Sequence, residues 1–104
     1  MTTSAIRHLR HLQVLLEALS ASGIEMERHE YDTLAFGNFA LVLAKGRTKV
    51  RFLWNEKDLI LTVQYRNAEH EEIDEPWTHD AFIKVASAED VFAEIGSNAE
   101  AMLD

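Results

Sequence analysis

The residues best suited to chemistry in this chain are its five histidines. His70 lies in an acidic segment and His79 precedes Asp80, and a neighbouring carboxylate orients an imidazole and raises its basicity. Both are therefore candidates for a general base or for a ligand of a divalent ion. With Trp77 as an aromatic wall, His70 and His79 define a candidate ligand pocket that a small enzyme or a ligand-binding protein could use.

His8 and His11 form a second pair, at a spacing that a metal ion accepts when both residues share one helix face. No third ligand is near them in the sequence, and Arg7 and Arg10 beside the pair oppose the binding of a cation. We therefore expect a hydrated polar face here, and the sequence predicts no metal and no cofactor.

The chain lacks the familiar catalytic motifs. It has no cysteine, which excludes disulfides, cysteine zinc sites, iron–sulfur clusters and cysteine nucleophiles. Its four glycines, at positions 23, 37, 46 and 96, allow neither a Walker loop nor a dinucleotide-binding fingerprint. The sequence thus favours a non-enzymatic protein, although missing motifs do not exclude an enzyme.

The elements that must position these residues follow from the apolar periodicity. Three- and four-residue steps predict a helix from the N-terminus to Gly23 and another that starts at Ser87 and ends at Gly96, with a last short turn near Leu103. In the second helix we expect the Ser87 oxygen to accept from the third backbone amide. Alternation with period two predicts strands at about 24–32, 39–44, 49–54 and 59–66, whereas residues 80–85 fit a fifth strand or a helical turn.

This order predicts one α+β domain over residues 1–104, a two-layer sandwich. Its antiparallel sheet of four to five strands is a meander, with the N-terminal and C-terminal helices packed on one face. The longest apolar run, residues 39–44, is too short to cross a membrane, so we predict a soluble, cytoplasmic protein.

The two faces of the predicted sheet differ in character. The inward side is apolar, and its members are Val50, Phe52, Trp54, Leu59, Leu61, Val63 and Tyr65. The outward side mixes cations with aliphatic residues, and Leu53, Ile60, Thr62 and Arg51 form a candidate protein-contact surface. Nucleic acid is not expected there, because Phe52 and Trp54 point away from the cations and the net charge of −8 repels phosphate.

Charge is distributed unevenly along the chain. Residues 1–52 contain seven Lys and Arg against five Asp and Glu, whereas residues 53–104 contain three against thirteen. The densest acids form a candidate contact loop, namely Glu69, Glu71, Glu72, Asp74 and Glu75. Such a loop is an ordinary solvated segment or a recognition element for a basic protein.

These observations favour a non-enzymatic protein-binding module that associates with itself, as a homodimer, through the outer sheet face or an exposed strand edge. Small size and acidity resemble those of immunity and inhibitor proteins, so one alternative is an acidic antagonist of a basic partner. The other alternative is the small enzyme or ligand carrier with its site near residues 70–80.

Overall fold

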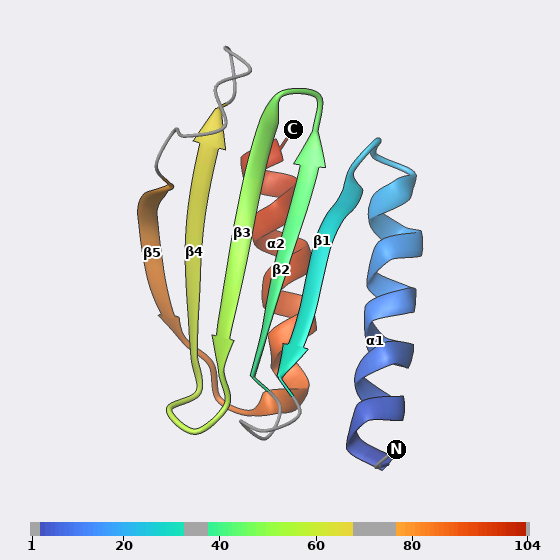
Figure 1. Ribbon diagram of the computed structural model, residues 1–104, viewed down its shortest axis with the longest axis vertical. Coiled ribbons are helices and arrows are strands. Elements are labelled where there is room, and N and C mark those ends of the chain that lie inside the picture. The colour runs from blue at the N-terminus through green and yellow to red at the C-terminus, as the bar shows by residue number, and fades with distance from the viewer. Residues whose placement is uncertain (1–2, 33–37, 68–76, 104) are drawn as a thin grey trace.

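The computed structural model describes residues 3–32, 38–67 and 77–103, and it contains one five-stranded antiparallel sheet and two α-helices (Figure 1). The strands lie side by side in chain order, so the sheet is a meander. The predicted α+β fold is confirmed, and the ambiguous segment after residue 78 is a strand. The elements are α1 (Thr3–Ser20), β1 (Glu25–Asp32), β2 (Asn38–Lys45), β3 (Thr48–Asn55), β4 (Ile60–Asn67), β5 (Thr78–Lys84), the 3-10 turn η1 (Ala88–Asp90) and α2 (Val91–Leu103).

Both helices pack against the sheet, but they do so in different places. Helix α2 crosses one face behind β2 and β3, whereas α1 lies beside β1 and also contacts α2 (Figure 1). The buried side chains of α2 recur at every fourth position, at Val91, Ile95, Ala99 and Leu103. This spacing places one continuous apolar stripe of the helix on the sheet.

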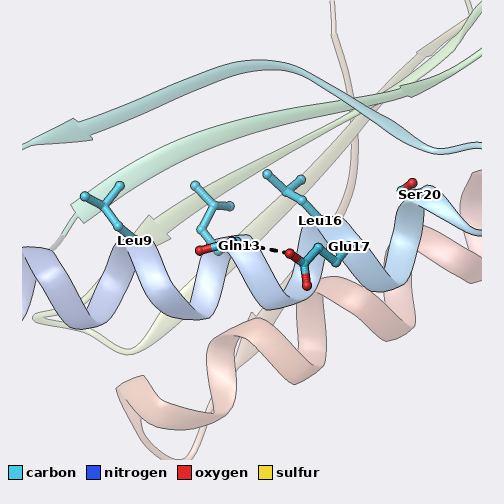
Figure 2. Close-up of a pocket in the computed structure, with 6 residues that line it drawn as sticks. Leu9, Gln13, Leu16, Glu17 and Ser20 are labelled. Carbon is cyan, nitrogen blue, oxygen red and sulfur yellow. Dashed lines mark hydrogen bonds between the residues drawn. The ribbon is translucent and has the colours of Figure 1, made fainter.

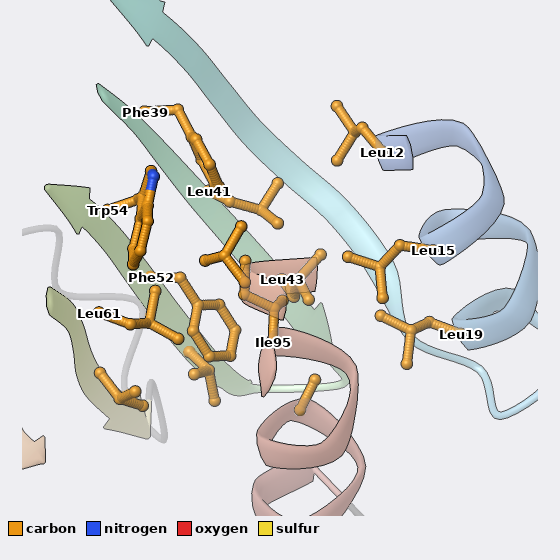
Figure 3. Close-up of a cluster of buried hydrophobic side chains, with 14 of the residues drawn as sticks. Leu12, Leu15, Leu19, Phe39, Leu41, Leu43, Phe52, Trp54, Leu61 and Ile95 are labelled. Atoms are coloured by element: carbon orange, nitrogen blue, oxygen red, sulfur yellow. The ribbon is translucent and has the colours of Figure 1, made fainter. Parts of the chain in front are cut away.

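The core lies between α2 and the inner face of the sheet, with leucines of α1 closing one side (Figure 3). Phe52 and Trp54 of β3 and Leu61 of β4 are buried, as the period-two alternation predicts. Tyr65 differs from the prediction, because its side chain is 40% exposed. Since α2 packs mainly on β2 and β3, it leaves this end of β4 uncovered.

Helix α1 ends in a Schellman motif. Gly23 adopts a φ of 78°, its amide donates to the Ser20 carbonyl at 3.0 Å, and the Ile24 amide donates to the Leu19 carbonyl at 3.2 Å. Leu19 and Ile24 are both buried, which supplies the apolar contact that accompanies this motif. The predicted helix stop at Gly23 is therefore correct.

Gly96 does not end α2, contrary to the prediction. The helix continues through it to Leu103, and a Cβ atom built at this position would lie 3.1 Å from Leu15 Cδ1 of α1. Because Gly96 has no side chain, α1 and α2 can approach each other closely at this position. Ser87 also differs: its carbonyl accepts from the Asp90 amide at 3.1 Å, while its hydroxyl donates to the Asp90 carboxylate.

The β2–β3 hairpin turns at Gly46, whose φ is 62°, between the paired residues Lys45 and Thr48. We expect Gly46→Ala to lower the free energy of unfolding by about 1 kcal/mol, because an L side chain disfavours positive φ. A Cβ atom at this position would meet nothing within 4 Å, so the cost is purely conformational. Urea denaturation measures the loss, with Lys57→Ala, at an exposed position of the β3–β4 turn, as the control that should change little. Equal losses in the two variants would contradict the conformational explanation.

Candidate functional site

The outer face of the sheet, which points away from α2, carries the four residues predicted as a protein-contact surface. In the strand register Leu53 lies opposite Thr62, Asn55 opposite Ile60 and Arg51 opposite Gln64. Leu53, Thr62 and Ile60 are all partly exposed. The structure therefore brings the predicted residues together on β3 and β4.

Phe82 of β5 extends this surface, and the sequence prediction missed it. It lies opposite Thr62 and its side chain is 68% exposed, the highest value among the exposed large apolar residues of the described chain. The sequence places Phe82 on the outer face only if residues 78–84 form a strand. Neighbouring side chains of a strand point to opposite faces, and Ile83 packs against the core, so Phe82 points outward. We call Leu53, Ile60, Thr62 and Phe82 the apolar strip.

The apolar strip borders a sheet edge. In the described part of the chain β5 pairs with β4 alone, so its other side has no neighbouring strand. Such an edge presents backbone donors and acceptors to a second chain. The β4–β5 register shifts between Val63 and Gln64, so Phe82 lies in the run of pairs before the shift and the remaining pairs of β5 follow in a shifted register.

The other end of the outer face is basic and is organised around Trp77. The guanidinium carbons of Arg51 and Arg66 lie 4.7 and 4.9 Å from the centre of the Trp77 ring, a cation–π arrangement. Arg51 Nε also donates to Gln64 Oε1 at 2.7 Å. Burial, and secondarily the charge of Arg66, lower the pKa of Arg51 from its usual value. Arg51 is thus fixed in place at the border of the apolar strip.

The candidate ligand pocket near residues 70–80 does not gain support from this arrangement. Trp77 lies against the two arginines on the outer face. His70 and the acidic loop from Glu69 to Glu75 lie outside the described residues, as does the side chain of His79. These residues stay sequence predictions.

His8 is buried rather than hydrated, which corrects the predicted polar face. Its side chain is only 8% exposed, and its ring lies 4.6 Å from Tyr31, 4.7 Å from Phe39 and 5.4 Å from Phe92, measured between ring centres. The sequence did contain the signal, because position 8 continues the buried series Leu12, Leu15 and Leu19 at helical steps. His11, in contrast, is exposed.

His8 contacts a second histidine from β1. The two Nε2 atoms of His8 and His29 are 2.8 Å apart, so one neutral ring donates a hydrogen bond and the other accepts it. Burial, followed by the charges of His29 and His11, lowers the pKa of His8 to about 4, and burial lowers the pKa of His29 as well. Both rings are consequently neutral at pH 7.

The histidine pair lacks the ligands of an ordinary metal centre. Among the residues that the structure describes, no three His, Asp or Glu side chains converge on one point. Tyr31, Phe39 and Phe92 occupy the surroundings of His8 instead. The arrangement is suited to proton-linked changes in packing.

A shallow apolar groove runs along α1. Figure 2 shows Leu9, Gln13 and Leu16 projecting from the same side of the helix, with Gln13 Nε2 donating to Glu17 Oε1 at 3.3 Å. Its lining contains the Ser20 hydroxyl and the Glu17 carboxylate but no histidine. The groove therefore offers apolar contact and no evident catalytic chemistry.

Comparison with known proteins adds no family. No family model matches the chain, and neither the curated proteins nor the solved structures include a significant match. Neither helix in residues 3–32 and 77–103 is long and apolar enough to cross a bilayer. Functional inference therefore depends on the residues and their geometry.

Proposed function

We propose that this protein is a non-enzymatic self-associating module that forms a two-fold homodimer through the apolar strip on its outer sheet face. The observation that carries the proposal is Phe82, which is 68% exposed beside an open strand edge and in register with Thr62 and Leu53. Exposed apolar residues scattered singly are normal, whereas a contiguous group beside a free edge is typical of a contact surface.

A dimer is stabilised by the burial of two copies of the apolar strip, one from each chain. Full burial of one phenylalanine side chain is worth about 1.5–3 kcal/mol. In a two-fold contact the same patch is used on both chains, so each gain from Phe82, Leu53 and Ile60 is counted once per chain.

Charge complementarity favours a second copy as the occupant. We place the two-fold axis perpendicular to the strands, through the Leu53–Thr62 pair. The residues of β3 that precede Leu53 in one chain then face the residues of β3 that follow Leu53 in the partner chain. Arg51 then approaches the β3–β4 turn of the other chain, which carries Glu56 and Asp58, whereas Lys49 is paired with Glu27 of its own chain at 2.7 Å. Opposite charges that flank an apolar contact fix its register and discourage other arrangements.

We expect Phe82→Asp to weaken dimer formation by roughly 100-fold or more, because a charge replaces the most exposed ring of the strip on both chains. Sedimentation equilibrium measures the change, and circular dichroism checks that the variant is folded. Val14→Asp is the matched control, since Val14 is 67% exposed but lies on α1. Wild-type protein that remains monomeric at high micromolar concentration, or equal effects of the two variants, would contradict the proposal.

The antagonist alternative makes a different prediction for the same surface. Binding of a basic partner through the acidic loop would survive Phe82→Asp and would weaken when the five acids from Glu69 to Glu75 are neutralised. No described contact favours this alternative over self-association. The enzyme or ligand-carrier alternative likewise has no described geometry in its favour.

A further inference from the structure

The contact between His8 and His29 is a polar link between α1 and β1. It joins Nε2 to Nε2 at 2.8 Å, with the two rings nearly parallel at an interplanar angle of 21°. The His8 ring also contacts three aromatic rings from three different elements, Tyr31 of β1, Phe39 of β2 and Phe92 of α2.

Protonation changes this contact in a defined order. With both rings neutral, one N–H faces one lone pair. A first proton leaves a donor and an acceptor, but it places a positive charge on the buried His8 ring or directly beside it. A second proton leaves two N–H groups facing each other at hydrogen-bond distance, so the rings must separate.

The described groups around the pair do not neutralise an added positive charge. On α1 the charge of His11 opposes protonation of His8. Tyr31 of β1, a phenol, contacts the His8 ring, as do Phe39 of β2 and Phe92 of α2. Arg28 and Glu30, which flank His29 in the sequence, form an ion pair with each other.

We propose that the His8–His29 contact is an acid-sensitive latch, which holds the first turns of α1 on the sheet at neutral pH and releases them as the pH falls towards 4. The C-terminal half of α1 stays attached, because Leu12, Leu15 and Leu19 are buried in the core independently of the latch. Release uncovers the ring cluster of Tyr31, Phe39 and Phe92. The latch is separate from the apolar strip, so it does not depend on the proposed dimer.

The position of α1 makes local release possible. The helix lies beside β1 at the border of the sheet, and in Figure 1 no other element covers its outer side. Of its first described side chains, His8 is buried while Arg7, Leu9 and Arg10 are exposed. Once the histidine contact opens, the contact of the His11 ring with Phe92 of α2, at 5.7 Å between ring centres, is a remaining described attachment of this part of the helix.

Nuclear magnetic resonance on the full, 15N-labelled chain tests the latch. We measure the titration of each histidine ring, and the hydrogen exchange of the backbone amides of α1 from pH 7 to pH 4, corrected for intrinsic exchange. We expect His8 to titrate well below 6.5, and protection of residues 9–12 to fall at least 10-fold more than that of residues 16–19.

Two variants separate the latch from general acid sensitivity. His8→Phe combined with His29→Phe keeps two flat rings in contact and removes both titrating groups, so the local loss of protection should disappear. His79→Gln, on β5 at the opposite edge of the sheet from β1, is the matched control and should retain it. Titration of His8 at an ordinary value, uniform loss of protection along the whole chain, or an unchanged loss in the double variant would overturn the proposal. The wild-type titration decides the question even if the double variant does not fold.

Discussion

Phe52→Ala should lower the free energy of unfolding by about 3–5 kcal/mol, the largest effect that we expect from any single substitution in this chain. The Phe52 ring is fully buried, and it lies in register with Leu41 of β2 and Val63 of β4, which are fully buried too. Figure 3 shows it between the sheet and α2, near Ile95. Truncation therefore leaves a cavity at the centre of the core.

The neighbouring residue provides a matched control for this prediction. Leu53 is on the same strand but points to the outer face, where it is partly exposed. We expect Leu53→Ala to cost about 1 kcal/mol at concentrations where the protein is monomeric, since less surface returns to water. Urea denaturation of both variants measures the difference. Equal losses would mean that the two faces of β3 are assigned incorrectly.

The second large effect is a loss of stability in acid. The pKa of His8 falls from 6.5 to about 4 on folding, so the unfolded chain binds more protons than the folded chain between these two values. The folded state therefore has its full stability, as far as His8 is concerned, above about pH 6.5, and it loses stability as the pH falls towards 4. For His8 alone the loss amounts to about 3 kcal/mol, and the lowered pKa of His29 adds in the same direction.

Thermal or urea unfolding between pH 7 and pH 4 measures this dependence. In the His8→Phe, His29→Phe double variant the slope in this window should become much smaller, because only groups outside the pair still titrate. His79→Gln, on β5 at the opposite edge of the sheet, should keep the contribution of the pair to the slope. If the stability of the double variant falls with decreasing pH as steeply as that of the wild type, groups other than His8 and His29 cause the acid sensitivity.

The sheet could be predicted from the sequence because period-two alternation is strong in its centre. Phe52 alternates with Leu53 and Leu61 with Thr62, so the register and both faces of β3 and β4 follow directly. In β1 the same rule fails, because a register shift between Met26 and Arg28 changes which residues face inward. His29 then points to the core face, whereas strict alternation that starts from the buried Ile24 would place it on the outer face.

The candidate sites were harder to predict because they depend on contacts between distant residues. His8 and His29 are 21 positions apart, and only the packing of α1 beside β1 brings their rings together. Phe82 joins Leu53 and Thr62 only when β5 is a strand, and a short apolar run does not distinguish strand from helix. Trp77 is positioned by Arg51 and Arg66, a contact that its sequence neighbours do not indicate.

Native mass spectrometry of the untagged protein, purified gently from its own cells, tests self-association most directly. We predict a species of twice the 11.9 kDa chain mass, with no bound metal, small ligand or other protein. The same preparation carrying Phe82→Asp should appear as a monomer. A heteromeric complex, an added small mass, or a wild-type chain that is monomeric throughout would contradict the proposed dimer.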